Sequence, residues 1–148
     1  MVSKESKKEI KFLINMFSKS PQTTLGIEKI LKVDPLIGEA KVMYKARKNM
    51  CHSGNSVQGG FITGWLDAVM ALACMSKVGI NTLVLSLEIK TTFIKKVLPK
   101  SVLVTGSVIS AGKSIAFLEG NIQDNQNNIL AKGNQTVKLI SNFYNKTL

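Results

Sequence analysis

One stretch of this chain predicts a helix with apolar side chains on every side, and it limits the possible folds more than any other feature. After Gly59-Gly60 and up to Lys77, the large side chains are apolar: Phe61, Ile62, Trp65, Leu66, Val69, Met70, Leu72 and Met75. A helix without a polar face has to be buried on all sides. We therefore expect the rest of the chain to wrap around this helix.

Asp67 lies in the middle of the predicted helix and is the only charged residue between His52 and Lys77. Taking a carboxylate out of water costs several kcal/mol unless it is paired, hydrogen-bonded or opens onto a cleft. A lone acid in such a place is a candidate functional group. The structural alternative is an Asp that only hydrogen-bonds a neighbouring strand. Gly59-Gly60 at the helix start favours function, because bare backbone N–H donors there meet the positive end of the helix dipole.

The segments around this helix predict an amphipathic helix and a set of strands. Residues 1–20 repeat apolar side chains at helical spacing, and we expect this helix to end at Ser20-Pro21 and to cover the main domain. Period-two alternation predicts strands, which we place at 27–33, 39–47, 83–93, 102–108, 115–122 and 129–139. The expected fold is α+β, with one antiparallel sheet curling around one helix in a domain of residues 21–148.

The composition narrows the partners and the compartment. At 148 residues the chain is one domain, and its net charge of +11 favours anionic partners. The lysines show no aromatic interleaving and no recognition-helix pattern, so we expect no nucleic-acid partner. Two cysteines without a signal peptide indicate a reducing, cytoplasmic location. We expect no membrane span, because the central helix looks shorter than the roughly 20 residues required and carries Asp67.

Several common chemistries lack their residues here. The single histidine, His52, with Cys51 and a distant Cys74, does not match the spacing of a zinc site. The chain has no Gly-x-Ser-x-Gly elbow and no glycine-rich phosphate-binding motif. A Cys51-His52 nucleophile pair is weak, since adjacent residues of an extended segment point apart. The remaining candidate chemistry is that of a carboxylate acting opposite backbone N–H donors at a helix N-terminus.

Three segments resemble a known family in order and spacing: Val57-Gln-Gly-Gly-Phe-Ile-Thr-Gly-Trp-Leu-Asp67, Leu87-Glu-Ile-Lys-Thr-Thr-Phe-Ile-Lys95 and Gly112-Lys-Ser-Ile-Ala-Phe117. Over residues 38–139 the chain resembles the hotdog-fold acyl-CoA thioesterases of the phenylacetic-acid-degradation (PaaI-like) type. The resemblance implies a hotdog fold and hydrolysis of acyl-CoA thioesters to free acid and coenzyme A. It implies no metal and no cofactor, because coenzyme A is part of the substrate.

The resemblance also assigns roles to residues. It implies that Asp67 is the general base or nucleophile, that the Gly59 N–H polarises the thioester carbonyl, and that Ser86 helps to hold the attacking water. Four further residues are expected to bind substrate: Gln58, Gly60, His52 and Asn55. Gln58 replaces the histidine that often precedes the two glycines, and it can still donate a hydrogen bond. His52 stands where some members carry an asparagine, and Asn55 is a nearby amide that can take its place.

The helix geometry predicts an oligomer. Gly59 and Asp67 are eight positions apart, which is ~12 Å along a helix. The thioester carbon has to lie ~3 Å from both the oxyanion donor and the nucleophile. One helix cannot satisfy both distances, whereas an antiparallel partner helix in a homodimer or homotetramer can. The sequence leaves open the acyl group, the number of subunits and whether Asp67 acts as base or nucleophile.

Three alternatives compete with thioester hydrolysis. The first is a non-catalytic hotdog protein that binds acyl-CoA or another lipid, against which the intact Asp67, Gly59 and Ser86 argue. The second is a hotdog dehydratase, which is a poor match because His52 lies in a loop before the helix. The third is a nucleic-acid-binding module, which rests on net charge alone.

Overall fold

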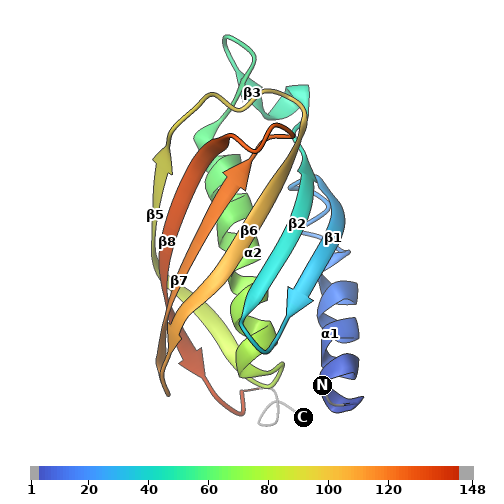
Figure 1. The fold of residues 1–148 in the computed structure, drawn as a ribbon, viewed down its shortest axis with the longest axis vertical. Helices are drawn as coiled ribbons and strands as arrows, with labels where there is room; N and C mark the ends of the chain where they lie inside the picture. Colours follow the sequence, from blue (N-terminus) through green and yellow to red (C-terminus); the bar gives the residue numbers. More distant parts are fainter. Residues whose placement is uncertain (1–3, 144–148) are drawn as a thin grey trace.

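A six-stranded antiparallel sheet packs on one long helix, and a second helix lies beside it (Figure 1). The computed structural model describes residues 4–143. The sheet order is β1-β2-β6-β7-β8-β5. The elements are α1 (Lys4–Phe17), β1 (Ile27–Asp34), β2 (Glu39–Lys45), a 3-10 turn η1 (Lys48–Met50), β3 (Cys51–His52), β4 (Ser56–Val57), α2 (Gly59–Val78), β5 (Leu83–Phe93), β6 (Ser101–Ala111), β7 (Ile115–Gln123) and β8 (Ile129–Ile140).

The central helix predicted from the apolar stretch is α2, and the expected hotdog architecture is confirmed. Trp65, Leu66, Val69 and Met70 are fully buried against the sheet. Gly79 follows the helix with a φ of 91°, a left-handed conformation that glycine adopts without strain. Burial of these side chains is the main source of the fold's stability, because apolar surface leaves water where α2 meets the strands.

The predicted strand at 39–47 is β2, and its alternation separates core side chains from surface ones. Ala40, Val42 and Tyr44 are completely buried, whereas the residues between them are partly exposed. The Tyr44 ring stacks on Trp65 of α2 with centroids 5.8 Å apart. The Trp65 indole N–H donates to the Leu25 carbonyl at 2.8 Å, so the largest core side chain also has its polar atom satisfied.

A row of three glycines lets α2 approach the sheet closely. Gly106 on β6 pairs with Gly120 on β7, which in turn pairs with Gly133 on β8. A Cβ at Gly106 would lie 2.7 Å from backbone atoms of Val69 and Met70. No side chain fits between strand and helix at this point. The glycine row therefore determines the distance between α2 and the sheet.

Strand β5 forms one edge of the sheet and changes face halfway along. Its pairing with β8 shifts between Ser86 and Glu88, which leaves Leu87 as a bulged residue. Leu85 and Leu87 are exposed, by 42% and 57%, whereas the Ser86 hydroxyl contacts α2. The apolar alternation of this strand therefore does not mark the face toward the helix.

The N-terminal helix α1 contributes two side chains to the core. Leu13 and Phe17 of α1 are buried, with exposed fractions of 1% and 4%. Residues 1–3 of the predicted helix lie outside the described residues, and α1 ends at Phe17. The division into residues 1–20 and 21–148 stays a prediction.

Two expectations require correction. The segment before α2, where His52 was expected in a loop, also contains a short hairpin, because β3 and β4 pair there with His52 opposite Ser56. The argument from length against a membrane span is also wrong. With 20 residues, α2 is long and apolar enough to cross a membrane by length and composition alone. Its buried faces pack against the sheet, as in a core helix of a globular domain.

Candidate active site

Asp67 lies at the centre of a small hydrogen-bonded cluster that joins three elements. The Ser86 hydroxyl on β5 donates to Asp67 Oδ1 at 2.9 Å. The Gln135 side-chain amide on β8 donates to the same Oδ1 and to Ser86 Oγ, the latter at 2.7 Å. Asp67 is half-buried and Ser86 is exposed, so the cluster is open on one side. The structure thus brings together Asp67 and Ser86, two of the three predicted catalytic residues.

Gln135 was missed by the sequence analysis, although β8 carries a signal for it. The residues of β8 that face α2 alternate with exposed ones and are otherwise small or apolar: Ala131, Gly133, Gln135, Val137 and Leu139. A glutamine in this row, with 2% of its surface exposed, is a polar residue at a core position. Buried polar side chains require hydrogen-bond partners. A glutamine in this row therefore indicates a polar partner inside the fold, and Asp67 of α2 is that partner.

The N-terminus of α2 presents one free backbone donor. Gln58 caps the helix, because its Oε1 accepts from the Gly60 N–H at 2.8 Å. The Gly59 N–H has no acceptor within the described part of the chain. A Cβ at Gly59 would lie 2.9 Å from the Phe93 ring, so this ring packs directly on the glycine. The cap uses the oxygen of the Gln58 amide and leaves its N–H₂ group available to donate.

A hollow of about 450 Å³ lies beside Gly59. Its walls combine apolar side chains with two lysines, Lys95 and Lys96, and they also include His52. The exposed His52 ring lies with Nδ1 2.8 Å from the Ser53 carbonyl oxygen. Asn55 is exposed at the tip of the β3–β4 hairpin with a φ of 55°, and it does not line this hollow. Of the two predicted alternatives, only His52 lines the same hollow as Gly59.

Within this chain, Gly59 and Asp67 therefore belong to two separate groups of residues. Asp67 does not line the hollow at Gly59, and eight residues of helix separate the two, which is ~12 Å. Between them, the Thr63 hydroxyl of α2 donates to Thr91 of β5 at 3.0 Å. Both groups contact β5, which supplies Ser86 to the group at Asp67 and Phe93 to the group at Gly59.

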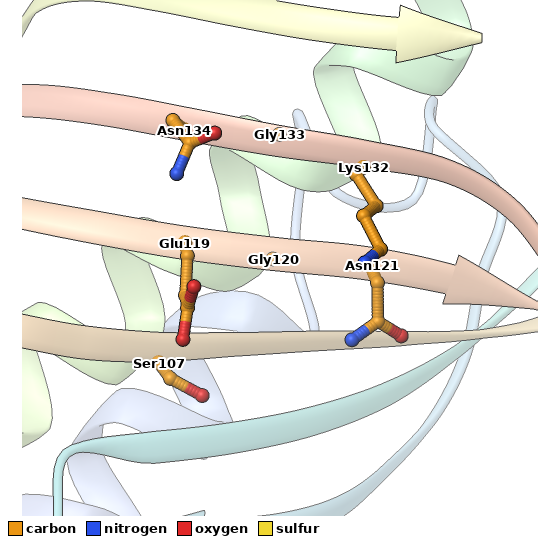
Figure 2. Close-up of a pocket in the computed structure, with 7 residues that line it drawn as sticks. All are labelled: Ser107, Glu119, Gly120, Asn121, Lys132, Gly133 and Asn134. Atoms are coloured by element: carbon orange, nitrogen blue, oxygen red, sulfur yellow. The ribbon is translucent and has the colours of Figure 1, made fainter. Parts of the chain in front are cut away.

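A different hollow lies on the opposite face of the sheet. Figure 2 shows its polar side chains on the side of the strands away from α2. It has a volume of about 250 Å³ and is lined by Ser107, Glu119, Gly120, Asn121, Lys132, Gly133 and Asn134. None of the predicted site residues lies there, so this hollow is separate from the Asp67 cluster.

The cysteines are not arranged for nucleophilic catalysis. The Cys51 thiol points to the Arg47 carbonyl oxygen at 3.6 Å, and the His52 ring lies against Ser53. Cys74 is fully buried in α2, and burial raises the pKa of its thiol to about 11. Within residues 4–143, no three side chains of the types His, Cys, Asp and Glu gather in a metal-binding group.

Comparisons with known proteins agree with this architecture. Residues 54–131 match the family model of the thioesterase superfamily, which is just over half of the chain. That segment includes Gly59, Asp67 and Ser86. No curated protein matches the sequence.

Solved structures with the same fold are numerous and distant in sequence. The Escherichia coli PaaI protein, from the phenylacetic acid degradation operon, is 19% identical with a TM-score of 0.82, and the match covers 96% of this chain and 98% of that one. A Haemophilus influenzae thioesterase is 18% identical with a TM-score of 0.80, covering 90% and 92%. A conserved Pseudomonas aeruginosa protein is 24% identical with a TM-score of 0.75, covering 82% and 94%.

The similar structures indicate the fold of this chain, and the family match indicates its superfamily. At these low identities the shared architecture establishes the fold, and the match to residues 54–131 establishes the superfamily. The resemblance drawn from the sequence motifs is thereby confirmed. The chain belongs to the thioesterase superfamily and has the hotdog fold of its PaaI-like members.

Proposed function

We propose that this protein hydrolyses acyl-CoA thioesters to a free acid and coenzyme A, in sites shared between two copies of the chain. The proposal rests on the hydrogen bonds and the partial exposure of the Asp67 carboxylate. Its carboxylate is held on one oxygen by Ser86 and Gln135, and it lies on the part of α2 that the sheet leaves partly open. The free Gly59 N–H at the start of the same helix supplies the matching electrophilic group.

Two features support assembly into a homodimer. Five of the α2 residues that stay exposed or partly exposed lie along one stripe, and most of their side chains are small: Gly60, Thr63, Gly64, Asp67 and Ala71. A second helix can approach closely along such a stripe. The adjacent strand β5 is an edge strand of 11 residues whose outer backbone groups have no strand partner in the sheet. An antiparallel arrangement of two copies would place Gly59 of one protomer opposite Asp67 of the other.

The reaction follows from these two groups. The thioester carbonyl oxygen accepts a hydrogen bond from Gly59, with the Gln58 amide N–H₂ group beside it. Asp67 takes a proton from a water molecule as the water oxygen bonds to the carbonyl carbon. The oxyanion that forms is stabilised by the Gly59 N–H at the positive end of α2. When the intermediate collapses, the carbon–sulfur bond breaks and the coenzyme A thiolate takes the proton from Asp67.

The hollow at Gly59 suits the two ends of such a substrate. Ile62, Phe93 and Val97 supply apolar surface for an acyl group or the pantetheine arm. Lys95 and Lys96 lie at the same hollow, where a positive charge attracts the phosphates of coenzyme A. The net charge of +11 favours the same anionic class of substrate.

The first test measures thiol release from aromatic, short-, medium- and long-chain acyl-CoAs. Asp67→Asn keeps the size of the side chain and removes its charge, so we expect kcat to fall by roughly 10²- to 10⁴-fold, the usual contribution of a general base. Size-exclusion chromatography should show an unchanged oligomer. Wild-type turnover that persists in Asp67→Asn would exclude Asp67 as the base. Binding without any thiol release by the wild type would indicate a non-catalytic acyl-CoA-binding protein instead.

The second test isolates the backbone donor. Proline is tolerated at the first helical position because it lacks an N–H that has no helical partner there. Gln58, with φ −66° and ψ 137°, already has the extended conformation required before proline. Gly59→Pro therefore removes the donor, while the matched Gly59→Ala displaces Phe93 in the same way and keeps the N–H. We expect kcat of Gly59→Pro to be about 10²- to 10³-fold below that of Gly59→Ala; equal values would contradict the role of Gly59.

The third test asks whether each site uses two chains. Coexpression of Asp67→Asn with Gly59→Pro gives mixed dimers in which one site has both intact groups and the other has neither. Random pairing at equal levels should restore about a quarter of the wild-type activity. If each site lies within one chain, the mixture stays as inactive as its two components.

A further inference from the structure

Gln135 does more for the candidate site than fill space. It is 2% exposed, and its Nε2 group donates to both Asp67 Oδ1 and Ser86 Oγ. Its own Oε1 is buried and accepts no hydrogen bond within residues 4–143. A buried acceptor without a donor costs free energy. An apolar side chain of the same length would fill the position without that cost, so core packing gives no reason for a glutamine here.

The charge of Asp67 fixes the orientation of the Gln135 amide. The reversed amide would place Oε1 against the carboxylate oxygen and remove a donor from Ser86. The observed orientation leaves Oε1 unpaired and gives both N–H bonds to the cluster. Hydrogen bonds to a charged acceptor are stronger than those between neutral groups. The amide is therefore oriented by Asp67, although this leaves its oxygen unsatisfied.

The two oxygens of the Asp67 carboxylate have different surroundings. Oδ1 accepts from both Ser86 and Gln135, whereas Oδ2 has no hydrogen bond within the described part of the chain. The Ser86 hydrogen is already used on Oδ1, and its oxygen accepts from Gln135. Ser86 thus has no hydrogen left to donate to a water molecule. The chain of donors runs from Gln135 through Ser86 to one carboxylate oxygen only.

The bulge at Leu87 makes this cluster possible. Before it, Ser86 contacts Asp67 on the α2 side of the sheet. After it, Glu88 accepts from Thr136 at 3.1 Å, where Thr136 lies in the exposed row of β8. Without the bulge, period-two alternation would direct Glu88 to the same side as Ser86. A second carboxylate beside Asp67 is thereby avoided, and Gln135 remains the neighbour on that side.

We propose that Gln135 is a positioning residue for the hydrolysis, an inference that rests on the proposed function. It holds Oδ1 through direct contact and through Ser86, so that Oδ2 alone faces the substrate. Oδ2 then takes the proton of the attacking water while the water oxygen bonds to the thioester carbon. The same oxygen later gives that proton to the departing sulfur. Ser86 serves as a fixed link in this arrangement and does not donate to the water.

The test compares Gln135→Met with Thr136→Ala, the next residue on the same strand, which faces the other side of the sheet. For Gln135→Met we expect kcat to fall by roughly 10- to 100-fold, because the base is no longer held in place. KM should stay within about threefold, and the melting temperature should stay close to that of the wild type, because the variant removes a buried unpaired acceptor together with the two hydrogen bonds that Gln135 donates. Thr136→Ala should keep wild-type kcat. A lower melting temperature with unchanged kcat in Gln135→Met would show a purely structural role.

Gln135→Glu gives a second readout that a structural role would not change. Two adjacent carboxyl groups share a proton, so the acidic limb of the pH–rate profile should move to higher pH. An unchanged acidic limb counts against the contact with Asp67.

A crystal structure of Gln135→Met tests the inference without turnover. We expect the Asp67 carboxylate to leave the Ser86 hydroxyl, and an unmoved carboxylate overturns the inference. If wild-type protein hydrolyses no acyl-CoA, the proposed function fails, while this structural comparison still decides whether Gln135 holds Asp67.

Discussion

The glycine row beneath α2 gives a prediction whose magnitude follows from measured distances. In Gly106→Ala, the new Cβ would lie 2.7 Å from backbone atoms of Val69 and Met70, whereas ordinary contact begins at 3.4 Å. Because backbone atoms cannot rotate away, strand and helix must separate by roughly 0.7 Å, the difference between these two distances. Overpacking of this kind costs about 1–3 kcal/mol. For a chain of this size, each kcal/mol lowers the melting temperature by about 2–4 °C.

Two matched variants calibrate this expectation. In Gly133→Ala the nearest atom is the Leu66 side chain at 3.2 Å, which can shift, so a smaller loss is expected. In Gly112→Ala the nearest atom lies at 3.4 Å, and the lower entropy of the unfolded chain makes the change neutral or stabilising by up to about 1 kcal/mol. Thermal and urea unfolding should rank the three variants in this order. A melting temperature of Gly106→Ala equal to wild type would refute direct packing of α2 on the sheet.

Three further outcomes are expected. Leu13→Ala in α1 should lower the unfolding free energy by about 2–4 kcal/mol in urea titrations, whereas Phe12→Ala, at a side chain 53% exposed, should change it little; equal effects would contradict the packing of α1. A thiol reagent at pH 8 should modify Cys51 in the native protein and Cys74 only after unfolding, and two reactive thiols in the native state would disagree with the burial of Cys74. Burial raises the pKa of the Cys74 thiol from 9.0 to about 11 and raises the pKa of Tyr44 as well, so the folded state keeps protons that the unfolded state releases. Unfolding free energy should therefore fall as the pH rises from 9 to 11, and a constant value over that range would contradict the shift.

Local sequence patterns determined the elements and their buried faces. Apolar side chains on every side of α2 predicted a central helix, and the period-two alternation of residues 39–47 predicted strand β2. Asp67 was recognisable because a charge within such a helix breaks the pattern. Each of these features depends on neighbours within a few positions, where the helical and strand periods act directly.

Only the tertiary structure decided which distant residues meet at Asp67. The order β7-β8-β5 brings Gln135 next to Ser86, 49 positions away in the sequence. The bulge at Leu87 determines that Ser86 and not Glu88 faces α2, although the leucines of β5 suggest a continuous apolar face. Periodicity specifies one buried face for each strand, but it does not specify the neighbouring strand or the residue at which pairing shifts. The order of the strands and the position of the bulge are determined when the whole sheet packs around α2. Contacts between distant segments contribute most of the free energy that selects this strand order and this register.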